Sequence, residues 1–187
     1  MIKTKEDLRT YLKADQAMRK KPNRLFLKWL TRSEDYYLRA FMVTLRHYEY
    51  WLNQKRNIFQ QIPYLLWWWN YRRLKLKLGI NIPPNVAGPG FFPVHPGFIY
   101  LGDFVTIGKN CRILPMVVTA KKYPGVPSRV VIGDNCTINV GVTIISPVNI
   151  GNNVTIAAGA VVTKDVPDNA VVAGVPAKII KMQEIIN

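Results

Sequence analysis

The chain has 187 residues and a mass of 21.4 kDa, enough for one domain with a hydrophobic core plus a small helical attachment. Hydrophobic residues make up 49% and charged residues 20%, a composition that excludes wholesale disorder. The formal charge of +15 is uneven, because residues 1–78 hold 18 Lys and Arg against 6 Asp and Glu, whereas residues 79–187 hold 8 against 5. We therefore predict two parts that meet near Gly79. The first part also holds all the tryptophans: Trp29, Trp51, Trp67, Trp68 and Trp69.

The sequence also argues against a membrane-spanning helix, an export signal and structural roles that need several cysteines. The longest strongly apolar run, residues 62–69, is shorter than the roughly 20 residues of a membrane-spanning helix. The N-terminus, MIKTKEDLRT, lacks the apolar core of an export signal. Two cysteines, Cys111 and Cys136, are too few for a disulfide scaffold or a four-ligand zinc site. We expect a cytoplasmic protein that binds no metal.

The first two helices are predicted from caps and apolar spacing. Thr4 is a suitable N-cap with Asp7 in the first turn, and the helical pattern ends near residues 20–22. Ser33 begins a second helix. Its apolar stripe falls at intervals of three and four residues: Tyr37, Leu38, Phe41, Leu45, Tyr48 and Leu52.

A third helix is predicted at the end of the basic region. It begins near Pro63, because proline is tolerated at a helix start, and it runs through the tryptophan cluster to Leu78. Gly79 ends the helix.

A six-residue period runs through the second part of the chain. Nine aliphatic residues begin the hexads: Leu101, Ile107, Ile113, Ile132, Ile138, Ile144, Ile150, Ile156 and Val162. Four residues after each stands a small or β-branched residue: Val105, Cys111, Val117, Cys136, Val142, Val148, Val154, Ala160 and Val166. Such a period does not keep one face of an α-helix, whereas three hexads make an 18-residue coil that stacks on its neighbours. We predict a mainly β protein, a parallel β-helix preceded by an α-helical region.

Two features of the repeat carry further predictions. Cys111 and Cys136 occupy the small inward position, which favours core packing over a redox or nucleophilic role. The segment from Thr119 to Val130 interrupts the period with charges and prolines, so it is expected to loop out of the column. Loops on rigid scaffolds often carry function.

The hexads, the out-looped segment and the ending AVVAGVPAK (170–178) together resemble the left-handed parallel β-helix acyltransferases over residues 79–182. The segment GPGFFPVHPGFIYLGD (88–103) is similar to the serine acetyltransferase branch, which includes bacterial surface-polysaccharide O-acetyltransferases. The resemblance implies a left-handed coil, whereas the period alone gives the coil and not its hand.

The resemblance places the chemistry on His95. An imidazole that is largely neutral at cytoplasmic pH suits the task of taking the proton from an acceptor hydroxyl. The other histidine, His47, is expected to lie on a helix face. Asp103 matches an acidic position of the branch and is a candidate to orient the base, although a plain turn role is the alternative. A structural role for His95 is likewise the alternative to catalysis. Without an exposed nucleophile, direct transfer in a ternary complex is preferred to an acyl-enzyme.

Departures from the serine acetyltransferase pattern concern the acceptor. Asn81 and Val94 stand where that pattern has aspartates, and the loop has Pro127, Ser128 and Arg129 where the pattern has an Arg-His pair. These changes favour a sugar hydroxyl in a surface polysaccharide or glycan precursor, with serine as the alternative acceptor.

For the donor, the resemblance implies acetyl-CoA lying in a groove between adjacent solenoids of a homotrimer. Lys164 and Lys178 match basic positions near its phosphates. The turn positions that match its pantetheine arm are Val140, Gly141, Ala158 and Gly159.

Residues 1–78 have two alternative roles. In the first interpretation, these residues cap the first coil and help the chain to form a trimer. In the second, their basic and aromatic side chains contact an anionic membrane surface. A non-catalytic membrane-associated scaffold is the remaining alternative to an enzyme. The charge alone carries no nucleic-acid recognition motif, so no nucleic-acid partner is expected.

Overall fold

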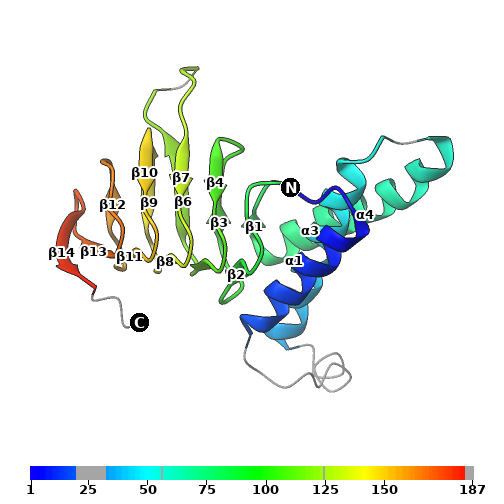
Figure 1. Ribbon diagram of the computed structural model, residues 1–187, viewed down its shortest axis with the longest axis horizontal. Helices are drawn as coiled ribbons and strands as arrows, with labels where there is room; N and C mark the ends of the chain where they lie inside the picture. The colour runs from blue at the N-terminus through cyan, green and yellow to red at the C-terminus, as the bar shows by residue number, and fades with distance from the viewer. Residues whose placement is uncertain (20–32, 56, 124, 184–187) are drawn as a thin grey trace.

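The structure, a computed structural model, describes residues 1–19, 33–55, 57–123 and 125–183. Three helices, α1 (Lys5–Ala17), α3 (Glu34–Leu52) and α4 (Ile58–Leu78), precede a stack of short strands. Figure 1 shows the helices gathered at one end of the stack. The strands are β1 (Ile80–Asn81), β2 (Phe92–Pro93), β3 (Ile99–Tyr100), β4 (Val105–Ile107), β5 (Arg112–Ile113), β6 (Val117–Lys121), β7 (Val130–Ile132), β8 (Thr137–Ile138), β9 (Thr143–Ser146), β10 (Val148–Ile150), β11 (Thr155–Ile156), β12 (Val161–Val162), β13 (Ala170–Ala173) and β14 (Lys178–Met182).

The strands form the three faces of a left-handed parallel β-helix. Face A has the order β1-β3-β6-β9-β12, face B has β10-β7-β4, and face C has β14-β13-β11-β8-β5-β2. The chain visits faces A, B and C in turn, and successive coils pair in parallel, with β14 alone antiparallel among the described pairs. Thr137 pairs with Thr155 and Thr143 with Val161, so the predicted coil of 18 residues is confirmed.

The interior of the β-helix is the aliphatic column that the period predicts. All eighteen hexad positions, nine aliphatic and nine small or β-branched, are buried, and the most exposed of them, Val166, reaches only 7%. The repeat places each side chain inward because the strands alternate buried and outward residues, as in β4 and β7. Burial of this continuous column supplies the hydrophobic stabilisation of the stack.

The out-looped segment is shorter than predicted. Strand β6 continues to Lys121 and β7 begins at Val130, so only the residues between them leave the column. Thr119 is buried, and its hydroxyl accepts a hydrogen bond of 2.9 Å from the Gly102 backbone N–H. A β-branched threonine that can satisfy a neighbouring turn therefore stays in the strand, although the sequence breaks the hexad period there.

The helices confirm two predicted starts and correct the third. Thr4 and Asp7 form a capping box before α1, and Ser33 caps α3. Helix α4 begins at Ile58 rather than near Pro63, because Asn57 and Gln60 form a second capping box and draw the start upstream. Helix α1 ends at Ala17, and the predicted end near residues 20–22, like Trp29, lies outside the described residues.

A buried ionic cluster joins the helices to the first coil. The fully buried Arg46 of α3 donates to Asp15 of α1 at 2.8 Å and to Glu49 at 3.0 Å. Its guanidinium also donates to the backbone carbonyls of Ala87 and Gly88. Burial alone would lower the pKa of Arg46, but the carboxylates of Glu49 and Asp15 outweigh it and raise that pKa. The helical region is thus fastened to the coil by charge-assisted hydrogen bonds.

Among the described residues, no helix combines the length and the apolar character that crossing a bilayer requires.

Candidate active site

His95 lies in the turn between β2 and β3. This turn belongs to the C–A edge, which we define as the turns leading from face C to face A: residues 94–98, 114–116, 139–142 and 157–160. The side chain is 55% exposed, so the ring is accessible. Its Nδ1 lies 3.0 Å from Oε1 of Glu34, the first residue of α3. When Glu34 accepts a hydrogen bond from Nδ1–H, Nε2 keeps its lone pair and can act as a base.

Asp103, the other predicted catalytic residue, is not brought to His95. It follows Gly102 on the A–B edge, defined as the turns from face A to face B, so strand β3 separates it from the histidine within one chain. Its side chain is exposed, as expected for a turn residue. Within one chain the carboxylate that can orient His95 therefore belongs to Glu34, not to Asp103.

Sequence reasoning missed Glu34 because its local signal has another explanation. An acidic residue directly after an N-cap stabilises the positive end of a helix, and Glu34 fits that role after Ser33. The contact with His95 spans 61 residues. A contact between residues so far apart in the chain depends on how the helices dock on the first coil. No local sequence pattern encodes such a contact.

The four turn positions predicted for the donor lie on the same edge as His95. The Gly159 N–H donates to the Val140 carbonyl at 2.9 Å, and the Gly141 N–H donates to the Pro115 carbonyl at 3.1 Å. Ala158 precedes Gly159 in the last of these turns and is exposed. Since coils stack about 4.8 Å apart, the three steps from the turn of His95 to that of Gly159 span about 14 Å.

The two lysines predicted to bind the donor phosphates lie in different places on the β-helix. Lys178 begins β14 and pairs with Ala173 at the end of β13, beyond the last turn of the C–A edge. Lys164 follows β12 and lies on the A–B edge with Asp103. Both lysines are exposed. Only Lys178 is therefore on the side of His95 within one chain.

The cysteines and His47 have structural surroundings. Both Cys111 and Cys136 are buried and unbridged. A hydrogen bond with Cys136, together with burial, raises the pKa of the Cys111 thiol, which opposes thiolate formation. His47 of α3 donates from Nδ1 to the Val43 carbonyl at 2.8 Å and stacks on Trp67 at 4.3 Å between ring centroids.

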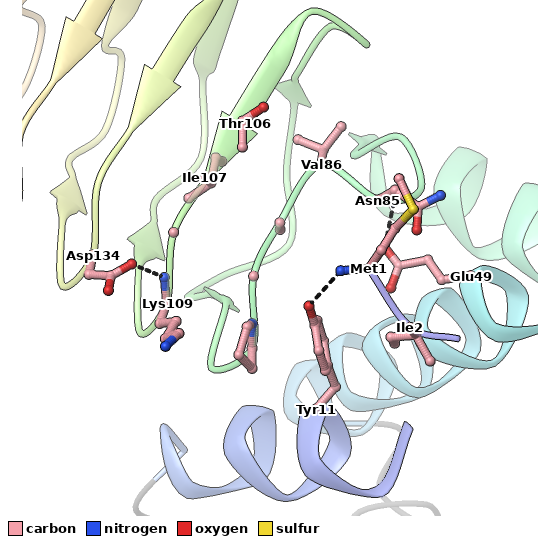
Figure 2. A pocket seen from close by; sticks show the side chains of 14 residues that line it. Met1, Ile2, Tyr11, Glu49, Asn85, Val86, Thr106, Ile107, Lys109 and Asp134 are labelled. Atoms are coloured by element: carbon pink, nitrogen blue, oxygen red, sulfur yellow. Dashed lines mark hydrogen bonds between the residues drawn. The ribbon is translucent and has the colours of Figure 1, made fainter. Parts of the chain in front are cut away.

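A pocket of about 280 Å³ lies elsewhere, where the helices meet the first coils. Figure 2 shows Tyr11 and Glu49 on the helical side and Lys109 and Asp134 on the coil side. Among its described lining residues, none is a site residue predicted from the sequence. This pocket therefore adds no group to the arrangement around His95.

Comparison with known proteins agrees with this architecture. Residues 129–164 match the family described as bacterial transferase hexapeptide (six repeats). The serine acetyltransferase of Brucella abortus strain S19 in complex with coenzyme A superposes with a TM-score of 0.68 at 27% identity, over 96% of this chain and 68% of that one. The resemblance to the left-handed β-helix, hexapeptide-repeat acyltransferases is confirmed.

Two named relatives of this chain are serine acetyltransferases, the branch that the sequence resembles. A serine acetyltransferase of Synechococcus elongatus is 31% identical over 139 residues, which are 70% of this chain and 52% of that protein. Serine acetyltransferase 2 of Arabidopsis thaliana is 33% identical over 120 residues, which are 60% of this chain and 35% of that protein. The chain thus spans about half or less of the length of these relatives.

Proposed function

We propose that the protein is an acetyl-CoA-dependent O-acetyltransferase in which His95 is the general base. The observation that carries the proposal is the C–A edge, where an exposed histidine with a carboxylate on Nδ1 shares one line of turns with the donor positions. The coenzyme A complex of the Brucella relative supports a coenzyme A thioester as donor.

The proposed reaction is direct transfer between the two substrates. Nε2 of His95 takes the proton from the acceptor hydroxyl as its oxygen bonds to the thioester carbonyl carbon. The carbon–sulfur bond then breaks, and the imidazolium returns the proton to the departing thiolate. Glu34 holds the ring through Nδ1 and stabilises the imidazolium that forms in between. The buried cysteines are not available for an acyl-enzyme.

Two acceptors have support from different observations. The serine acetyltransferases among the relatives favour serine and support this alternative better than polysaccharide acetylation. The substitutions at Asn81, Val94 and the loop residues Pro127 to Arg129 favour a sugar hydroxyl instead. Serine and a sugar both accept the acetyl group on a hydroxyl, so both acceptors are consistent with O-acetylation.

The proposal includes a homotrimer in the cytoplasm. A groove between adjacent solenoids would draw on two edges of the β-helix, and the predicted residues do divide between the C–A edge and the A–B edge, where Asp103 and Lys164 lie. Two free cysteines fit a reducing compartment. Light scattering of the purified protein tests the trimer.

The deciding experiment measures release of the free coenzyme thiol from acetyl-CoA with serine and with a panel of saccharides. We expect His95→Ala to lower turnover by about two to four orders of magnitude, while calorimetry shows acetyl-CoA binding nearly unchanged. Unchanged turnover would remove His95 from the mechanism. A protein that neither binds acetyl-CoA nor turns over either acceptor class would instead be the non-catalytic scaffold.

A further inference from the structure

Helix α4 has an apolar face that faces solvent. Seven large apolar side chains on it are each at least 51% exposed: Ile58, Phe59, Ile62, Leu65, Leu66, Trp69 and Leu76. At about 100° per residue they fall within an arc of about 120°, so they form one face rather than scattered positions. We call this set the α4 outer face. Contiguous exposed apolar surface of this kind marks an interaction site.

The opposite side of α4 already packs against the protein. Tyr71, Leu74 and Leu78 are buried in the main core, and Trp67 and Trp68 pack against it. The helix therefore has two apolar sides. One side packs against the core, and the other, the α4 outer face, is exposed. Packing of α4 against α3 does not account for the outer face, which indicates a second apolar environment.

Positive charge continues the α4 outer face toward the coils. Arg72 and Arg73 are exposed and fall on the same side of the helix as the apolar set. Lys77 is exposed at the margin of this side, where its Nζ lies 3.9 Å from the centroid of the Tyr37 ring of α3. The sequence of α4 contains four basic residues and no Asp or Glu. The same helical surface is thus apolar over its first three turns, and over its last two turns it carries these three cations beside Leu76.

A hollow beside this cationic end combines charge with aromatic rings. Its volume is about 320 Å³, and the Arg72 guanidinium lies 4.9 Å from the centroid of the Trp68 ring. The lining is Trp68, Tyr71, Arg72, Lys75 and Leu76. Two cations beside aromatic and aliphatic side chains suit a phosphate group whose attached chain is apolar.

We propose that the α4 outer face binds the surface of an anionic phospholipid bilayer. The apolar turns lie among the acyl chains at the interface, and Arg72, Arg73 and Lys77 contact lipid phosphates. Trp69 belongs to the residue type that gathers at membrane interfaces. Parallel pairing of this face with the same face of a second copy is disfavoured, because it would bring the cations of both helices together without an acidic partner. Contact between copies in another arrangement is an outcome of the light-scattering test below. In Figure 1, α4 leads from β1 toward the end of the molecule opposite the last coil.

The test uses the whole protein and vesicle sedimentation. Vesicles of phosphatidylcholine alone are compared with vesicles that contain phosphatidylglycerol. We expect at least ten-fold tighter binding to the anionic vesicles, weakened by high salt. The variant Ile62→Gln, Leu66→Gln, Trp69→Gln is expected to lose at least ten-fold in affinity, and Arg72→Gln, Arg73→Gln, Lys77→Gln is expected to lose the preference for anionic lipid.

Matched controls separate the membrane from other partners. Ile179→Gln with Ile180→Gln removes comparably exposed apolar side chains from β14 and should bind vesicles like the wild type. Light scattering without lipid reports the oligomer. Wild-type binding by the apolar triple variant overturns the proposal, and so does a change in its oligomer mass without a change in vesicle binding, which would make the face a contact between copies. Acetyl transfer to a water-soluble acceptor is measured separately. The vesicle assay therefore decides the membrane proposal even if the enzymatic proposal fails.

Discussion

At the scale of single residues, the exposed His95 depends on a partner from a distant helix. Glu34 is the first residue of α3, and the Ser33 side chain accepts a hydrogen bond from the Tyr36 N–H in the cap. Because Leu38 and Phe41 of the same helix are buried, the helix start is fixed relative to the first coil. The carboxylate is therefore presented to Nδ1 by packing rather than by local sequence, and it selects the tautomer that leaves Nε2 free.

Removing this carboxylate should affect turnover and not donor binding. We expect Glu34→Ala to lower kcat by roughly 10- to 100-fold, the range for groups that orient a functional histidine. Glu34→Gln keeps an oxygen that accepts from Nδ1–H and should lose less, because only the charge is removed. Steady-state kinetics with both substrates gives kcat and the donor KM for each variant.

The control for Glu34 is Glu6→Ala, which removes another exposed acidic residue from the first turn of a helix, in this case α1. Its kinetics should match the wild type. Equal kcat values for Glu34→Ala and the wild type would show that the 3.0 Å contact has no part in catalysis.

At the scale of elements, the edges of the β-helix use different turn residues. On the edge from face B to face C, asparagines with positive φ stack from coil to coil, and their side-chain amides bond in a ladder: Asn110 to Asn135, Asn135 to Asn153, and Asn153 to Asn169. On the C–A edge the positions with positive φ include Gly141 and Gly159. Asparagine fills its edge with satisfied side chains, whereas Gly141 and Gly159 leave their part of the C–A edge open to a ligand.

The open space at Gly159 allows a test of the proposed donor groove. A Cβ there would meet nothing within 4 Å, although the φ of +69° strains any L-residue. We expect Gly159→Ala to lower stability by about 1–2 kcal/mol through this strain and to weaken acetyl-CoA binding as well. Thermal unfolding and calorimetry measure the two effects.

Gly125 provides the matched control. It has φ of +80° and open space around its Cβ position, but it lies in the segment between β6 and β7 that leaves the column, and none of the positions predicted to bind the donor belongs to that segment. Gly125→Ala should show a similar strain and unchanged donor affinity. If both variants bind acetyl-CoA equally well, the donor does not pass along Gly159.

At the scale of the whole molecule, one buried cation ties three segments together. Arg46 meets Asp15 of α1, Glu49 of its own helix and the carbonyls of Ala87 and Gly88. Asp15 in turn accepts hydrogen bonds from the backbone N–H groups of Gly90 and Phe91. The cluster holds the helices on the first coil in the arrangement that also brings Glu34 to His95.

Breaking this cluster should destabilise the protein strongly. We expect Arg46→Met to lower the free energy of unfolding by about 3–5 kcal/mol, because Asp15 and Glu49 would be left buried without a counter-charge. Adding Asp15→Asn and Glu49→Gln should recover part of that loss, since both amides keep an acceptor oxygen. Urea denaturation followed by circular dichroism gives the values. An unchanged midpoint for Arg46→Met would mean that the cluster does not hold the two regions together.

The sequence by itself determined the β-helix and the stacking of the turns that are predicted to bind the donor. The same two positions of every hexad point into the column, so the eighteen buried positions follow from local spacing alone. Once the coil of 18 residues is known, Val140 and Ala158 must stack on one edge, because they stand 18 residues apart.

Tertiary structure alone decided the partner of His95, the separation of Asp103 from it, and the true length of the loop. Thr119 stays in a strand because a turn in the preceding coil needs its hydroxyl, and Glu34 reaches His95 because the Arg46 cluster docks α3 on the coil. These contacts join residues far apart in the chain, and their free energy depends on packing that no short window of sequence contains.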